Sequence, residues 1–243
     1  MKSIPAYKVL LTTSGTGSRL KELTKNTNKA LVLLNGKPTV TYIVDAYPEA
    51  TEFVVTVGYL GDQVKEALPR LYPTRRFTFV EVDKYEGPGS SLGYSMLKAE
   101  SFLRCPFIFH ACDTIVFGHP VKEPNKNWMG GYRMVGDKSQ YRTIEISDAG
   151  KAVNINEKKE GKSEHVFIGY FGIHDFEIYW KSLRQLYGND PLNQNLNDTM
   201  PLNDMLHKGI PFDLITYPTW LDTGNPTAFE ETVKFLTQQH ENR

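Results

Sequence analysis

The chain has 243 residues, enough for one large hydrophobic core or for one core with a modest appendage. Its 28 basic and 28 acidic side chains balance, so no broad nucleic-acid-binding face is expected. The apolar run at residues 9–11 is too short for a signal peptide or a membrane span, which predicts a cytoplasmic protein without a membrane partner.

The first half of the chain alternates short apolar runs with segments of helical spacing. Strands are predicted at residues 7–13, 53–57, 77–82 and 106–110, and helices at residues 38–47, 62–71 and 91–103. Such alternation predicts a mostly parallel sheet with helices on both faces. Gly15, Gly58 and Asp113 each follow a predicted strand, so we expect them at one edge of that sheet.

The second half begins with strand-like segments joined by polar or glycine-containing turns. Strands are predicted at residues 128–135, 143–147, 152–156 and 166–173, and helices at residues 176–186, 202–207 and 228–238. No linker or repeat separates the two halves. We therefore predict a single domain over residues 1–243, with a nucleotide-binding half at 1–127 and an acceptor-binding half at 128–243.

The stretch VLLTTSGTGSRL at residues 9–20 is an apolar strand that breaks into a loop of small residues. Glycines let backbone N–H groups approach an anion, and a following helix would direct its positive end toward the charge. Arg19 and then Lys29 would neutralise phosphate oxygens from outside the loop. The pattern predicts a nucleoside triphosphate site whose loop residues are Thr13, Ser14, Gly15, Thr16 and Gly17.

Two other phosphate-binding motifs are excluded by the residues present. No Gly-x-x-x-x-Gly-Lys-Ser/Thr string occurs, because Gly36-Lys37 is followed by Pro38. A dinucleotide fingerprint would need a glycine where Leu20 stands, so NAD or FAD binding is not expected. A Gly-x-Gly turn alone also occurs at ordinary strand-to-helix corners, so its neighbours carry the argument.

Those neighbours keep a fixed spacing: Thr24, Asn28-Lys29-Ala30-Leu31 and Gly36-Lys37-Pro38. With the loop they resemble the pattern G-x-G-x-R-L…T…P-K-A-L…G-K-P of the sugar-phosphate nucleotidylyltransferases. The chain departs from that pattern at Thr13-Ser14, where the family has two alanines, and at Asn28, where it has proline. The resemblance implies a three-layer, Rossmann-like α/β fold with a mixed, mostly parallel sheet, as in nucleotide-diphospho-sugar transferases.

Two aspartates are candidate metal ligands. Asp113 follows the apolar run FIFHAC, where the resemblance places a metal-binding aspartate. Asp222 lies in WLDTGNP, which resembles the family's W-x-D-x-G-T-P segment. Each also has a simpler interpretation, as a turn former or a helix cap. Two carboxylates beside a triphosphate would suit Mg²⁺, which favours few carboxylates together with phosphates and water.

Further matches concern the acceptor and the base. Lys158, in NEKK, resembles the lysine of the family's E-K-P segment, which binds the acceptor phosphate, although an exposed turn is an equal alternative. Arg142 follows Tyr141 where relatives have Tyr-Gly, which would crowd a hexose or recognise an anionic acceptor. The remaining matches, expected near the base and sugar of the nucleotide, are Gly58 and the helix start Gly89, Ser90 and Ser91.

The resulting hypothesis is a nucleotidyltransferase that joins a nucleoside triphosphate, CTP or UTP, to a phosphorylated small molecule and releases pyrophosphate. Arg19, Lys29 and Lys158 are the candidate catalytic residues, with Mg²⁺ as cofactor and no acid or base required. One alternative is a nucleotide-sugar glycosyltransferase, although its Asp-x-Asp motif does not occur. The other is a non-catalytic nucleotide-sensing homologue. Homo-oligomerisation is left open.

Overall fold

The computed structural model describes residues 7–161 and 163–241. Its strands are β1 (Lys8–Thr12), β2 (Leu33–Leu34), β3 (Lys37–Pro38), β4 (Glu52–Val57), β5 (Arg76–Glu81), β6 (Phe107–Ala111), β7 (Thr114–Phe117), β8 (Trp128–Arg133), β9 (Thr143–Ile146), β10 (Lys151–Asn156), β11 (His165–Ile173), β12 (Phe212–Thr216) and β13 (Thr219–Asp222). Its α-helices are α1 (Thr39–Val44), α2 (Gly61–Leu71), α3 (Leu92–Ala99), α4 (Phe176–Asn189), α5 (Thr199–His207) and α6 (Pro226–Glu241). Short 3₁₀ helices are η1 (Ser18–Thr24), η2 (Lys29–Leu31) and η3 (Glu100–Phe102).

Nine of the described strands form one mixed sheet, in the order β5-β4-β1-β6-β11-β8-β12-β10-β9. β5, β4, β1 and β6 run parallel, and Leu10 is in register with Val54 on one side and Phe109 on the other. From β6 onward the neighbours are antiparallel, apart from the parallel pair β8–β12. The predicted mixed α/β sheet is confirmed, with its longest parallel run in the first half of the chain.

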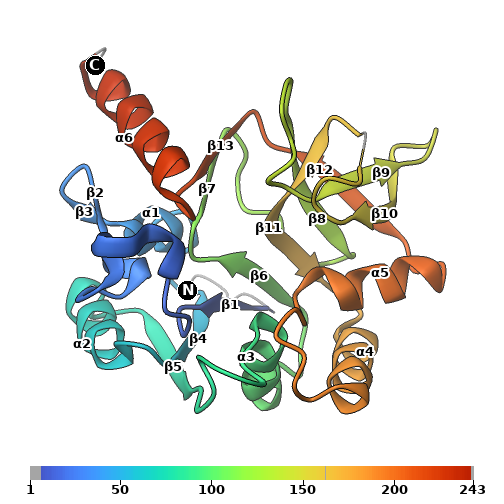
Figure 1. Ribbon diagram of the computed structural model, residues 1–243, viewed down its shortest axis with the longest axis horizontal. Helices are drawn as coiled ribbons and strands as arrows, with labels where there is room; N and C mark the ends of the chain where they lie inside the picture. Colours follow the sequence, from blue (N-terminus) through green and yellow to red (C-terminus); the bar gives the residue numbers. More distant parts are fainter. Residues whose placement is uncertain (1–6, 162, 242–243) are drawn as a thin grey trace.

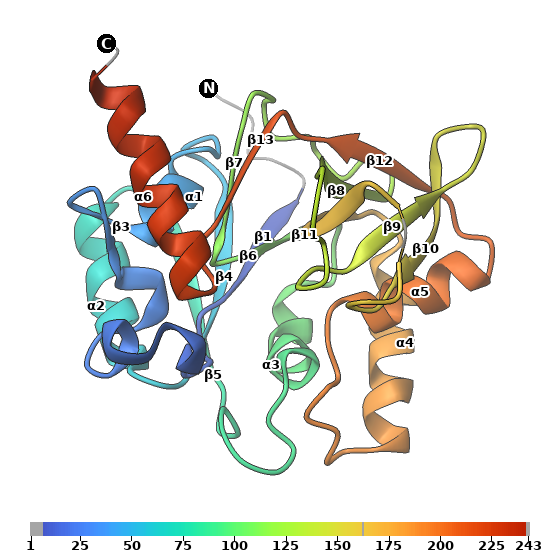
Figure 2. The same ribbon diagram turned by 45° about the horizontal axis from the view of Figure 1, so that its top comes forward.

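Helices cover both faces of the sheet, α1 and α2 on one face and α3, α4 and α5 on the other (Figures 1 and 2). The alternation of side chains along β1 produces this arrangement. Leu10 packs into the core beneath α3 and α4, whereas Val9 and Leu11 pack into the core beneath α1 and α2. Because β1 is buried on both faces along Val9–Leu11, these three consecutive residues are all apolar.

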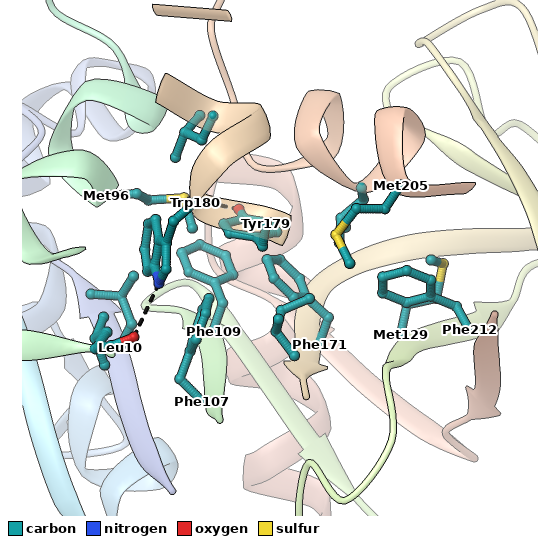
Figure 3. Close-up of a cluster of buried hydrophobic side chains, with 14 of the residues drawn as sticks. Leu10, Met96, Phe107, Phe109, Met129, Phe171, Tyr179, Trp180, Met205 and Phe212 are labelled. Atoms are coloured by element: carbon teal, nitrogen blue, oxygen red, sulfur yellow. Dashed lines mark hydrogen bonds between the residues drawn. The ribbon is translucent and has the colours of Figure 1, made fainter. Parts of the chain in front are cut away.

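Aromatic rings dominate the core beneath α4, which joins the two halves of the chain (Figure 3). Phe107 of β6 stacks on Trp180 of α4 with ring centroids 5.0 Å apart, and Phe109 stacks on Phe171 of β11 at the same separation. The Trp180 indole N–H donates to the carbonyl of Leu103 over 3.0 Å, so its buried polar atom is satisfied.

The end of the chain returns to the first half. β13 pairs antiparallel with β7, which sets Asp222 opposite Thr114. α6 then packs Phe229 and Leu236 into a third core that includes Leu20. Both cavities described below consequently take residues from each side of position 127.

Each strand and helix predicted above is present, with ends shifted by a few residues. Five strands were not predicted: β2, β3, β7, β12 and β13. β2 and β3 have two residues each, and β7, β12 and β13 are short strands that pair with segments far away in the sequence. Within the described part of the chain, no helix is both long and apolar enough to cross a membrane.

Candidate active site

The first residues of the predicted loop are held by their neighbours. Thr13 is fully buried, and both its N–H and its hydroxyl donate to the carbonyl of Thr56, over 2.9 and 2.8 Å. The Ser14 hydroxyl shares a 2.9 Å hydrogen bond with the hydroxyl of Ser95 on α3. Thr13 therefore supports the loop from behind and is not among the residues that line the two cavities described below.

The loop opens at its glycines. A Cβ added to Gly15 would have no atom within 4 Å, so this position faces free space. Gly17 has φ +66°, and an added Cβ would lie 2.9 Å from the methyl carbon of Thr24, whose hydroxyl donates to the Gly17 carbonyl over 3.0 Å. Glycine at residue 17 thus permits both the left-handed turn and the close packing.

The helix predicted after the loop is replaced by a short 3₁₀ helix. η1 is interrupted at Lys21, which has φ 51° and ψ −117°, so no continuous α-helix directs its N-terminus at the loop. The expectation of a helix dipole at this point was wrong. Positive charge near the loop comes from side chains instead.

Asn28, at the place of the family's proline, ties the next segment to the loop. Its side-chain amide donates to the carbonyls of Thr13 and Tyr59 over 2.9 and 2.8 Å, and its side-chain oxygen accepts from the N–H of Ala30. Because these bonds fix η2, they fix the base of Lys29. The substitution of proline by asparagine is therefore compatible with a rigid lysine position.

Lys29 and Arg19 converge on Asp113. The distances to Asp113 Oδ2 are 3.4 Å from Lys29 Nζ and 3.9 Å from an Arg19 terminal nitrogen. Burial opposes ionisation of Asp113, but the two cations outweigh it, so the pKa of this carboxyl is lowered. Burial also opposes the charge on Lys29, yet the attraction of Asp113 raises the lysine pKa. Lys29 and Asp113 are therefore both charged at neutral pH.

Asp222 reaches the same place from β13. One of its carboxylate oxygens accepts from the N–H of Gly224 over 2.7 Å, and the other accepts from the Tyr141 hydroxyl over 3.1 Å. Burial, and then the nearby charge of Asp113, raise the pKa of Asp222 to about 6. A second negative group is thus held close to the first, where a cation would stabilise both.

The distance between the Asp113 and Asp222 carboxylates decides whether they could share a metal ion, and the space at Gly224 sets an upper limit on it. A Cβ at Gly224 would lie 3.0 Å from Asp113 Oδ2 and 3.0 Å from Asp222 Oδ1, so the two oxygens are at most about 6 Å apart. Only a residue without a side chain leaves this gap between them. No group of three or more His, Cys, Asp or Glu side chains suited to a metal occurs among the described residues. Two carboxylates without a third ligand fit Mg²⁺ in the form it takes beside phosphates.

A cavity of about 580 Å³, the loop cavity, lies over the glycine-rich loop. The predicted residues that line it are Ser14, Gly15, Thr16, Gly17, Arg19, Lys29, Ser90, Ser91 and Asp113. Gly58 and Gly89 do not line it. Gly58 lies behind the loop, where a Cβ would be 2.9 Å from the Ser14 carbonyl oxygen, and Gly89 lies against the Pro191 carbonyl. Both are places of close backbone approach.

A second cavity of about 580 Å³, the Lys158 cavity, meets the first at Arg19, Ala111 and Asp113. Lys158 is solvent-exposed and lines this cavity together with Arg142 and Asp222. Partial desolvation, and then the charges of Arg19 and Arg142, lower the pKa of Lys158. A lysine crowded by two arginines marks a region that would favour an anion.

The sequence suggested that Arg142 could recognise an anionic acceptor. In the structure, its side chain is paired with an acid instead. Its Nε lies 3.0 Å from each carboxylate oxygen of Glu157, so that acid offsets its charge. Glu157 precedes Lys158, and the pair Arg142–Glu157 therefore fixes the turn that carries the lysine. This orientation of Lys158 depends on two segments that are apart in the sequence.

Sequence reasoning did not single out three other residues that line these cavities. Asp198 lines the Lys158 cavity, Gln194 lines the loop cavity, and Glu231 of α6 borders the former. Asp198 and Gln194 belong to the segment NDPLNQNLND at residues 189–198, whose composition indicates only turns. A buried acid in such a segment leaves no pattern that a reader of the sequence alone would detect.

Comparison with known proteins places this site in context. No family model matches the chain. It is 33% identical over 95 residues to a choline-phosphate cytidylyltransferase of Streptococcus pneumoniae, covering 38% of this chain and 40% of that protein. It is 24% identical over 239 residues to the UTP–glucose-1-phosphate uridylyltransferase AglF of Haloferax volcanii, covering 93% and 95%. The alignment to the bifunctional protein GlmU of Methanococcus vannielii spans only 34% of that relative.

The fold comparison agrees. A solved structure of the CTP:phosphocholine cytidylyltransferase of Streptococcus pneumoniae superposes with a TM-score of 0.77 at 19% identity, covering 95% of this chain and 99% of that one. The predicted resemblance and the predicted fold are both confirmed, and neither the glycosyltransferase nor the sensing alternative is favoured. In sequence and in fold, this chain is similar to sugar-phosphate nucleotidylyltransferases.

Proposed function

We propose that this protein transfers a nucleotidyl group from a nucleoside triphosphate to a phosphorylated small molecule. The observation that carries the proposal is the meeting of two cavities at Arg19 and Asp113, one over a glycine-rich loop and one lined by Lys158. A triphosphate in the first and an anionic acceptor in the second would bring their phosphates together there. Two of the curated relatives support it by their names, one a choline-phosphate cytidylyltransferase and the other a UTP–glucose-1-phosphate uridylyltransferase.

In the proposed reaction an acceptor phosphate oxygen attacks the α-phosphorus of the triphosphate. A new P–O bond forms there, the bond from the α-phosphorus to the bridging oxygen of the β-phosphate breaks, and pyrophosphate leaves with that electron pair. The nucleophile is already an anion, so positioning and charge stabilisation carry the rate. No proton transfer is needed in this step.

The basic residues would divide between the two substrates. Arg19 and Lys29, both within 4 Å of Asp113, would exchange part of that contact for phosphate oxygens of the triphosphate. Lys158 would hold the acceptor phosphate, because it lines the second cavity and not the first. Bound Mg²⁺, held by Asp113 and Asp222, would neutralise charge on the triphosphate.

Pyrophosphate release tests the proposal directly. The purified protein with Mg²⁺ is mixed with CTP, UTP, dTTP or GTP and with each of several acceptors, among them glucose 1-phosphate, glycerol 3-phosphate and phosphocholine. We expect release only when a triphosphate and an acceptor are both present, with CTP or UTP preferred. Phosphorus NMR should then show a diphosphate diester product. Absence of release from every pair would contradict the proposed function. Cytoplasmic location stays a prediction.

A further inference from the structure

One polar side chain, His110, lies in the otherwise apolar strand β6. The residue is 1% exposed and lines neither cavity, and β1 and β11 pair with its strand on the two sides. Burial lowers the pKa of His110 to about 4, so the ring is neutral at pH 7. Burying a polar ring costs free energy that an apolar side chain would not, so its hydrogen bonds indicate why it is there.

The two hydrogen bonds of His110 define which ring nitrogen carries the proton. Nε2 lies 2.9 Å from the carbonyl oxygen of Thr114, and because a carbonyl only accepts, Nε2 is the donor. Nδ1 is then the acceptor, and the Tyr47 hydroxyl donates to it over 2.8 Å. Burial raises the pKa of Tyr47 well above its ordinary value, so this hydroxyl keeps its proton. A donor and an acceptor thus hold the ring in one orientation.

The bond from His110 to Thr114 closes the turn that carries Asp113. His110 belongs to β6 and Thr114 is the first residue of β7, so the bond spans the three residues between them. The Thr114 hydroxyl also donates to the Ile168 carbonyl of β11 over 2.5 Å. In the pairing of β7 with β13, Thr114 lies opposite Asp222. The residue that His110 holds therefore follows one candidate metal ligand and is paired with the other.

β13 holds the same turn through separate bonds. The Asp113 carbonyl accepts from the N–H of Thr223 over 2.9 Å and from the Thr223 hydroxyl over 3.2 Å. Because Thr223 follows Asp222, these bonds join the backbones next to the two acids. With His110 bonded to Thr114, the carbonyls of two consecutive residues at the turn each have a partner. The backbone that carries the Asp113 side chain is therefore fixed on both sides of that side chain.

We propose that His110 is a positioning residue for the two carboxylates of Asp113 and Asp222. Oriented by Tyr47, it keeps the turn closed, so that both carboxylates lie at the separation that one divalent cation requires. An apolar side chain would fill the core equally well but would leave the Thr114 carbonyl without this partner. The inference rests on the proposed function, since that function gives the cation its role.

The first test measures cation binding without turnover. Mn²⁺, which like Mg²⁺ prefers oxygen ligands, is titrated into the protein without nucleotide, and free Mn²⁺ is followed by electron paramagnetic resonance. We expect His110→Leu to raise the Mn²⁺ Kd about tenfold or more. His110→Gln should stay within about threefold of the wild type, because its amide supplies both a donor and an acceptor. Asp113→Asn should abolish binding, which assigns the ion to this site.

The second test separates turnover from triphosphate binding. In pyrophosphate release, His110→Leu should lower kcat about tenfold or more and raise the Mg²⁺ concentration that gives half the maximal rate. The triphosphate Kd, measured without metal, should stay within about twofold, because His110 does not line the loop cavity. His110→Gln should recover most of the rate. Volume does not explain such a recovery, since leucine and glutamine are similar in size.

Two further variants separate positioning from stability. Tyr47→Phe removes only the hydroxyl that orients the ring, so it should also raise the Mn²⁺ Kd, and it serves if His110→Leu does not fold. Tyr72→Phe is the matched control, because it removes a hydroxyl that donates to Asp45 over 2.7 Å, and Tyr72 lines neither cavity. It should lower the Tm comparably to Tyr47→Phe and leave the Mn²⁺ Kd unchanged.

The outcomes distinguish the positioning role from the function itself. An unchanged Mn²⁺ Kd in folded His110→Leu and Tyr47→Phe, whatever their Tm, would make His110 a residue of the core alone and overturn the inference. A wild type that binds no Mn²⁺ would overturn it as well. Absence of pyrophosphate release from the wild type, with Mn²⁺ binding that still depends on His110, would instead remove the proposed function and leave the positioning role standing.

Discussion

At the scale of single residues, Asp113 and Asp222 act as a unit if they hold one Mg²⁺. Asp113→Asn and Asp222→Asn each remove a charge with little change of volume, and each should lower kcat by about 10²–10³, or about 3–4 kcal/mol. The double variant should be little slower than the slower single variant, since both ligands serve one ion. Steady-state pyrophosphate release with a Mg²⁺ titration measures this.

The same assay supplies the control. Asp148→Asn alters an exposed turn residue and should leave kcat unchanged. Wild-type activity should disappear with EDTA and return with added Mg²⁺. Additive losses from the two substitutions, or activity that persists in EDTA, would contradict the shared ion.

The role of Lys158 is tested by measuring its effect on the acceptor separately from its effect on triphosphate binding. Lys158→Ala should raise the acceptor KM and lower kcat, while the triphosphate Kd, measured by calorimetry, stays nearly constant. Its neighbour Lys159 is an exposed turn residue with φ 70°, so Lys159→Asn keeps a compatible turn and removes an equal charge. The control should behave as wild type. Equal losses in both variants would indicate a general effect of charge on this turn.

At the scale of elements, the loop between β1 and η1 contains two glycines in different surroundings. Gly15 faces empty space, whereas Gly17 packs against Thr24. Gly15→Ala adds a methyl group to empty space, so the Tm should hold while the triphosphate Kd rises as the backbone is screened from phosphate. Gly17→Ala places a side chain at φ +66° and 2.9 Å from Thr24, which should cost about 1–2 kcal/mol of folding free energy and lower the Tm.

Thermal unfolding with and without CTP or UTP separates the two effects. Gly188→Ala is the control, because it too adds a methyl group where no atom lies within 4 Å, but far from the loop at the end of α4. A triphosphate affinity unchanged in Gly15→Ala would show that the phosphates do not approach the loop backbone.

At the scale of the whole molecule, β11 unites the parallel strands of the first half with the antiparallel strands of the second. Phe171 on β11 is fully buried and stacks on Phe109 of β6. Phe171→Ala should cost about 3–5 kcal/mol in urea unfolding. Because one core spans both halves, tryptophan fluorescence and far-UV circular dichroism should report a single coincident transition.

Val135→Ala provides the comparison, since Val135 is 88% exposed and its truncation should change stability by less than about 0.5 kcal/mol. If Phe171→Ala instead unfolded in two separate transitions, with the strands of the first half still folded after the second half had unfolded, the halves would fold independently.

The sequence determined the local structure and the loop motif of this protein. The short apolar runs within residues 7–13 and 106–110 predicted strands of a mostly parallel sheet, and the structure contains them as β1 and β6. Spacing around Gly15, Arg19 and Lys29 predicted a phosphate site, and these residues line one cavity. Such features depend on neighbours along the chain, so a single sequence contains them.

The tertiary structure decided which distant residues meet. β13 returns to pair with β7, and only that pairing brings Asp222 to within about 6 Å of Asp113 across Gly224. The pairing of Arg142 with Glu157 and the burial of Asp198 arise in the same way, from contacts between segments far apart in the chain. Periodicity reports which face of an element is buried, but it does not report which other element covers that face. The burial of the Asp198 carboxylate beside a cavity therefore became visible only once the chain was folded.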